Sequence, residues 1–156
     1  MPTPPPATTV GSDPFAARPR RARLREHVPI LAVIALGGAI GATARYAAAL
    51  LWPTASGAFP WTVLLVNITG CAAMGALMVL IAEVWTAQRL LRPFLGTGVL
   101  GGYTTFSTYA AGFHHLVDTR HPAAGLIYLA ATPILALTAT WTAATLTHTL
   151  IDRRTR

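Results

Sequence analysis

The chain has 156 residues, of which 53% are hydrophobic and only 11% are charged. Soluble domains usually carry about 25% charged residues, so this composition excludes an ordinary soluble domain and favours a small integral membrane protein. The net charge of +7 comes from arginines that mostly flank apolar runs, a pattern typical of membrane topology signals and not of nucleic-acid binding. The single cysteine, Cys71, excludes a disulfide framework and a multi-cysteine metal site.

Residues 1–27 are rich in proline, alanine, threonine and arginine and show no apolar periodicity. They are expected to form a disordered basic tail on the membrane surface. A four-helix transmembrane domain is predicted over 28–151, with a short basic tail at 152–156. Each apolar run in this domain is long enough for the roughly 20 residues that cross a bilayer. The four runs cover residues 29–51, 61–82, 94–117 and 123–150.

The loops between the predicted spans are short, so neighbouring spans must run antiparallel. The N-terminal tail, the loop 83–93 and the C-terminal tail then share one side of the membrane. Together they hold ten arginines, whereas the opposite side holds only Arg120. The positive-inside rule therefore places both termini in the cytoplasm and predicts a multi-pass protein of the plasma membrane.

The predicted spans contain polar groups but no acid, because all five acidic residues lie outside them. Coupled carriers normally need a carboxylate within the membrane, so this absence argues against a small multidrug exporter. The spans do contain one cation, Arg45, and neutral donors such as Asn67, a combination that favours an anion. Three alternatives remain open: Arg45 as a snorkelling anchor, Asn67 as an interhelical hydrogen bond, and fourth-span threonines that bond their own helix.

The third span has a composition that suits a continuous helix poorly. Residues 96–108 hold four glycines and a cluster of β-branched and polar residues. Non-helical backbone at membrane depth is tolerated only where protein or a cavity covers it, and a broken helix offers carbonyls and amides to ions. We therefore expect a break here, at the functional centre. Close helix packing through Gly98 and Gly102 is an alternative that is compatible with a break.

Three motifs resemble those of the Fluc/CrcB fluoride channel family. Residues 37–46 read GGAIGATARY, similar to the family's first-helix GGxxGAxxRY. Residues 66–70 read VNITG, similar to VNxxG, and residues 101–109 read GGYTTFSTY, similar to GGxTTFSTF. The first motif alone is weak, whereas the third motif in the third of four spans, with the other two in order, is highly specific. The resemblance covers about residues 30–150.

The resemblance implies an all-α membrane protein with four transmembrane helices, the third broken mid-membrane. It further implies an antiparallel dimer with two fluoride pathways and a structural sodium ion at the dimer interface. Carried over by motif, the backbone carbonyls of Gly101 and Thr104 would hold the sodium ion. Arg45 matches the family's first-helix arginine and would supply an anion-favouring charge. The expected fluoride pathway comprises Asn67, Thr105, Phe106, Ser107, Tyr109, Tyr128 and Thr132, with Tyr109 where the family usually has phenylalanine.

The implied function is passive fluoride efflux from the cytoplasm, which would reduce fluoride toxicity. Aromatic edges, amides and hydroxyls can replace the water of a small anion without trapping it. A negative cell interior drives an anion outward by about 2.3 kcal/mol per 100 mV, so no coupling is needed. The alternatives are a transporter of another small solute and a non-conducting structural membrane protein. An enzyme is not expected, because the adjacent His114 and His115 point about 100° apart on a helix.

The arginine bias also predicts a partner. An antiparallel dimer forms either from one chain inserted in both orientations or from two chains of fixed, opposite orientation. A bias of ten arginines to one argues against dual insertion. We therefore expect a heterodimer with a similar chain of reversed bias, encoded by a neighbouring gene, and keep the homodimer as the alternative.

Overall fold

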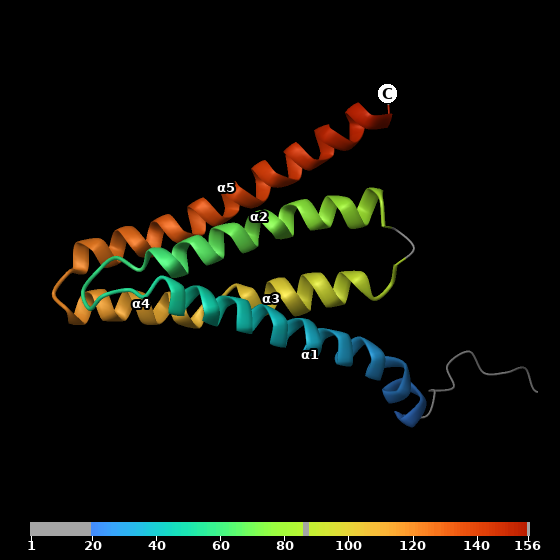
Figure 1. The fold of residues 1–156 in the computed structure, drawn as a ribbon, viewed down its shortest axis with the longest axis horizontal. Helices are drawn as coiled ribbons and strands as arrows, with labels where there is room; N and C mark the ends of the chain where they lie inside the picture. Colours follow the sequence, from blue (N-terminus) through green and yellow to red (C-terminus); the bar gives the residue numbers. More distant parts are fainter. Residues whose placement is uncertain (1–19, 86–87, 156) are drawn as a thin grey trace, which may run out of the picture.

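The computed structural model describes residues 20–85 and 88–155, which are helical apart from their connections (Figure 1). The elements are α1 (Arg20–Leu51), α2 (Trp61–Glu83), the π-helical η1 (Arg92–Leu100), α3 (Gly101–Tyr103), α4 (Ser107–Asp118) and α5 (Pro122–Thr155). The predicted all-α class is confirmed. Up to residue 19, the predicted disordered tail lies outside the described residues.

Both ends of the described chain continue their helices into the predicted tails. The first helix begins at Arg20 rather than at the predicted 29, and the last reaches Thr155. Arginine, alanine and leucine, which dominate residues 20–25, are good helix formers, so helical structure extends beyond the apolar stretch itself. Hydropathy marks the apolar run, whereas backbone propensity sets where a helix ends.

Three helices in the described part of the chain are long and apolar enough to cross a membrane: His27–Leu51, Trp61–Glu83 and Pro122–Arg154. They match the first, second and fourth predicted spans. The third predicted span, 94–117, falls on η1, α3 and α4 together. The helix of α3 ends at Tyr103, Thr104 has an extended backbone with ψ 158°, and α4 begins at Ser107.

The helices form an elongated bundle in which consecutive segments run in opposite directions, so that α1 is parallel to η1 and α2 is parallel to α5 (Figure 1). The principal contacts pair α2 with α5, α1 with η1 and α3, and α4 with α5. A small core of Leu64, Tyr109, Leu116 and Tyr128 lies where α2, α4 and α5 meet. Many large apolar side chains elsewhere are exposed, which is the surface that a lipid solvent requires. We call η1, α3 and α4 together the third segment. Its first part, η1 and α3, packs against α1, and its last part, α4, packs against α5.

The contact between α1 and the third segment depends on glycine. A Cβ added at Gly37 would meet the Phe94 carbonyl oxygen at 2.5 Å, and one at Gly102 would meet the Gly38 carbonyl oxygen at 2.5 Å. A Cβ at Gly98 would lie 3.0 Å from the Gly37 Cα. The close packing expected through Gly98 and Gly102 is therefore confirmed, and it brings α1 directly against η1 and α3.

Gly41→Ala is expected to destabilise the protein by about 1–3 kcal/mol, because its Cβ would collide with the Val99 carbonyl oxygen and the backbone must shift. Gly38→Ala is the matched control on the same helix, since a Cβ there meets no atom within 4 Å. Thermal unfolding of the purified protein in detergent measures both variants. Equal unfolding midpoints for the two would contradict this account of the interface.

Candidate functional site

The side chain of Asn67, on α2, forms hydrogen bonds with the backbone of the third segment just after the end of α3. Its Oδ1 accepts a hydrogen bond from the Thr105 backbone N–H at 2.9 Å, and its Nδ2 donates to the Thr105 carbonyl at 3.1 Å. The side chain is only 8% exposed. A side-chain amide therefore satisfies both backbone groups of a residue that lies outside any helix. One N–H of the amide remains available for a further acceptor.

The start of α4 is organised by the hydroxyl of Thr105. Its Oγ1 accepts a hydrogen bond from the Thr108 backbone N–H at 3.2 Å and lies 3.1 Å from the Thr108 Oγ1. The Ser107 hydroxyl lies 3.2 Å from the same Oγ1. This arrangement satisfies a donor that has no partner within the first turn of the helix.

Two carbonyls lose their helical donors through these bonds. In an uninterrupted α-helix, the Gly101 carbonyl would accept from the Thr105 N–H and the Thr104 carbonyl from the Thr108 N–H. In this structure the Thr105 N–H donates to the Asn67 side chain and the Thr108 N–H donates to the Thr105 side chain. The two carbonyls that the resemblance assigns to a sodium ion are therefore among those deprived of their usual donors.

Arg45 of α1 reaches the end of α3. Its Nε donates a hydrogen bond to the Gly102 carbonyl at 3.2 Å. Carbonyls in the last turn of a helix lack intrahelical donors, and a cation there is favourable. Arg45 also borders a small cavity of about 70 Å³ whose lining includes Thr105 and Thr108. The guanidinium of α1 thus adjoins the interrupted segment.

A larger cavity of about 470 Å³ brings most of the predicted site residues together. Its lining includes seven of them: Asn67, Gly101, Thr104, Thr105, Phe106, Tyr109 and Thr132. These residues come from α2, from the third segment and from α5, so only the tertiary fold assembles them. Cys71, Pro133 and Ala136 also line the cavity and were not predicted, because their apolar or small side chains give no chemical signal in the sequence.

The aromatic residues form a chain that runs inward from the surface. Phe106 is 80% exposed, and its ring centroid lies 5.6 Å from that of Tyr109. Tyr109 in turn lies 5.3 Å from Tyr128, with the rings tilted by 53°. Tyr128 is fully buried, and its hydroxyl has no hydrogen-bond partner among the described residues. Phe106 therefore presents its ring outward, whereas Tyr128 lies deep against Phe59 and Tyr109.

Thr132 is buried in α5, and its hydroxyl donates to the Tyr128 carbonyl at 2.8 Å. The other predicted fourth-span threonines bond the carbonyls of their own helix in the same way: Thr138, Thr140, Thr142, Thr145 and Thr147. The expectation that these threonines bond their own helix is confirmed. The single proton of the Thr132 hydroxyl is used within the helix.

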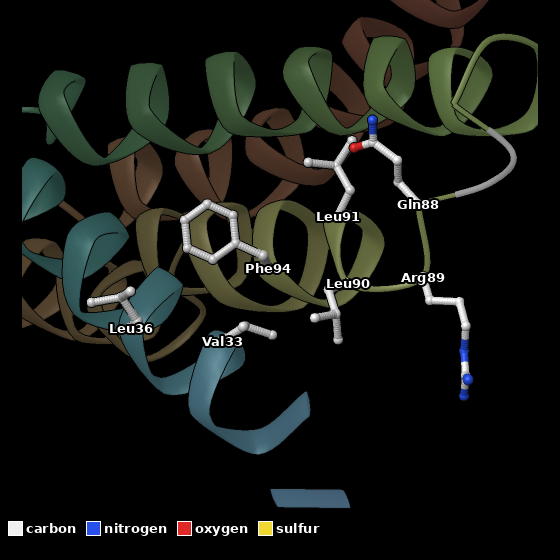
Figure 2. A pocket seen from close by; sticks show the side chains of 7 residues that line it. All are labelled: Val33, Leu36, Gln88, Arg89, Leu90, Leu91 and Phe94. Atoms are coloured by element: carbon white, nitrogen blue, oxygen red, sulfur yellow. The ribbon is translucent and has the colours of Figure 1, made fainter. Parts of the chain in front are cut away.

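A second groove lies away from these residues, between α1 and the start of η1 (Figure 2). It has a volume of about 500 Å³ and an apolar lining that includes Val33, Leu36 and Phe94. The side chain of Arg89 points away from it in Figure 2. None of the predicted site residues lines this groove. It has the character of a lipid-facing surface and contributes nothing to the site at the interrupted segment.

The fold and the site together define an all-α multi-pass membrane protein with polar groups gathered inside its helical bundle. Residues 32–144 match the family described as "CrcB-like protein, Camphor Resistance (CrcB)", and the chain belongs to this family. The resemblance predicted from the three motifs is thereby confirmed.

Named relatives match most of the chain. The chain is 61% identical over 127 residues to "Fluoride-specific ion channel FluC 2" of Streptomyces avermitilis, which is 80% of each protein. It is 60% identical over 130 residues to "Fluoride-specific ion channel FluC 1" of Streptomyces coelicolor, covering 83% of this chain and 84% of the relative. It is 50% identical over 108 residues to "Fluoride-specific ion channel FluC 2" of Nocardia farcinica, covering 69% of this chain and 77% of the relative.

Proposed function

We propose that this chain is one subunit of a fluoride-specific ion channel through which fluoride leaves the cytoplasm passively, which reduces fluoride toxicity. The observation that carries the proposal is the cavity in which Asn67 and the aromatic residues Phe106 and Tyr109 meet. The names of relatives up to 61% identical support the same assignment. A channel of this family performs no covalent chemistry, so the protein is not an enzyme. Residues 28–151 would form the channel, with basic tails on either side.

The interruption of the third segment would lie at membrane depth and form the centre of the channel. The hydrogen bonds from Asn67 and Thr105 support this placement, because they satisfy backbone groups that water cannot reach within a bilayer. Fluoride would then pass the free N–H of Asn67 and the ring edges of Phe106 and Tyr109, whose hydrogens carry partial positive charge. Thr105, Ser107, Tyr128 and Thr132 would line the remaining path, and Arg45 would favour an anion near the entry.

A structural sodium ion fits the chemistry of the interrupted segment. Hard cations take oxygen ligands, and the carbonyls of Gly101 and Thr104 have lost their helical donors. In a dimer, a second subunit would supply another pair of carbonyls. The bound cation would add a fixed positive charge beside the anion pathway and need no titrating group.

The subunits would pair in opposite orientations, with this chain keeping both termini in the cytoplasm. The ten arginines on the cytoplasmic side against Arg120 on the other side support a single orientation. The partner would be a related chain with reversed bias, with a homodimer as the alternative. The relatives of this chain in Streptomyces avermitilis include FluC 2 and FluC 3, at 61% and 38% identity, which is compatible with a channel made of two different chains.

Fluoride efflux from liposomes that hold the protein with its partner tests the function. A fluoride electrode is expected to record rapid release, and a chloride electrode is expected to record no more release than from protein-free liposomes. Rapid efflux of chloride or of another small solute would favour a transporter of different specificity. An assembled dimer that releases neither ion would favour a structural role.

Removal of sodium is expected to abolish fluoride efflux, because the ion would hold the two interrupted segments together at the dimer interface. The measurement compares liposomes prepared in sodium salts with liposomes prepared in N-methylglucamine salts at the same ionic strength. Readdition of sodium during preparation is expected to restore efflux. Equal rates in the two salts would remove the sodium ion from the proposal and leave the fluoride pathway in place.

A further inference from the structure

Pro133 removes a hydrogen bond from the middle of α5. Proline has no backbone N–H, so the carbonyl of Leu129, four residues earlier, has no helical donor at this point. Within a bilayer, an unsatisfied carbonyl is costly, and neighbouring side chains usually supply the missing donor. The identity of that donor determines what the proline does for the structure.

The donor is the hydroxyl of Tyr109. Its Oη donates to the Leu129 carbonyl at 2.5 Å and thereby joins α4 to α5. The ring itself is buried, stacked at tilted angles between Phe106 and Tyr128. A phenolic hydroxyl has one proton to donate, so this hydroxyl cannot donate to an anion at the same time. The extra oxygen of Tyr109 is therefore engaged in a bond to α5.

We propose that Tyr109 and Pro133 form a positioning pair, in which the hydroxyl of Tyr109 binds the carbonyl that Pro133 leaves bare and so fixes the Tyr109 ring in the cavity wall. The inference rests on the proposed function for the role of the ring in fluoride passage. It goes further in assigning the tyrosine hydroxyl to ring orientation rather than to anion contact. Pro133 leaves the Leu129 carbonyl without a helical donor, and the Tyr109 hydroxyl supplies that donor.

A double-mutant cycle of Tyr109→Phe and Pro133→Ala tests the hydrogen bond without reference to transport. In the natural chain, Tyr109→Phe leaves the Leu129 carbonyl unsatisfied and is expected to lower the folding equilibrium constant about fivefold. In the Pro133→Ala background, the substituted alanine supplies the missing backbone N–H, and the same change is expected to have an effect below about twofold. Thermal unfolding in detergent measures all four proteins. Equal losses in the two backgrounds would overturn the pairing.

Fluoride efflux separates positioning from a contribution to stability alone. If the hydroxyl orients the ring, Tyr109→Phe and the double variant are both expected to release fluoride about fivefold more slowly per assembled channel than the natural chain, although the substituted alanine restores the stability of the double variant. Recovery of the efflux rate together with stability in the double variant would overturn the positioning role. Should Tyr109→Phe alone fail to assemble, comparison of the double variant with the natural chain gives the same answer.

Tyr103→Phe is the matched control for loss of a tyrosine hydroxyl. The Tyr103 hydroxyl bonds Thr69 of another helix at 3.2 Å, and Tyr103 does not line the cavity. Its efflux rate is expected to stay within about twofold of the natural chain. If the natural channel itself released no fluoride, the proposed function would fail, yet the stability cycle would still decide whether Tyr109 and Pro133 are paired.

Discussion

Replacement of Asn67 by alanine is expected to slow fluoride efflux by about a hundredfold or more. The side chain makes two hydrogen bonds to the Thr105 backbone, and each bond holds a group that has no helical partner. Loss of both leaves an N–H and a carbonyl unsatisfied in a buried position, at a cost of about 1–3 kcal/mol for each group. The same substitution removes the second amide N–H of a residue that lines the cavity, the one that Thr105 leaves free. Efflux from liposomes, normalised to assembled dimer, measures the effect.

Two further variants distinguish loss of the anion contact from a general loss of structure in α2. Asn67→Asp keeps an acceptor for the Thr105 N–H but replaces the donor with a negative charge, so it is expected to block the anion while more of the dimer survives. Thr69→Ala, two residues along α2, removes a hydroxyl that bonds mainly its own helix and is expected to leave efflux within about twofold of the natural chain. Rapid fluoride efflux through the assembled Asn67→Asp channel would exclude Asn67 from the pathway.

Membrane vesicles from cells that make only this chain are expected to release fluoride no faster than vesicles from cells that lack it. With ten arginines on the expected cytoplasmic side and Arg120 on the other, we expect each copy to insert in the same orientation, so that two copies would not pair in opposite orientations. Production of a related chain with reversed arginine bias in the same cells is expected to restore rapid efflux. Vesicles avoid detergent, which would allow copies to reorient before they pair.

The control for the partner experiment is a second, tagged copy of this chain in place of the partner. It doubles the amount of protein without adding the opposite orientation, and no efflux is expected. Fast release from vesicles with this chain alone would show that the arginine bias does not prevent dual insertion, and the homodimer would then replace the heterodimer. That result would leave the site at the interrupted third segment unchanged.

The site could be predicted in part because its chemistry depends on rare residue types. An asparagine inside an apolar run and a block of threonines beside glycines are conspicuous in the sequence, and they led to Asn67, Thr104 and Thr105. Pro133 could not be found in this way, since a proline inside a span has several possible consequences. Only the position of Tyr109 shows that the carbonyl bared by Pro133 has a donor on another helix.

The sequence by itself determined the class of protein, the number of apolar runs and the family. Transfer of side chains from water to lipid depends on composition along one stretch of chain, so it can be read without knowledge of the fold. The tertiary structure alone decided where each hydrogen bond goes: Asn67 to the Thr105 backbone, Arg45 to the Gly102 carbonyl, and the Tyr109 hydroxyl to α5. Hydrogen bonds are short and directional, so their partners depend on which helices lie together and at what rotation.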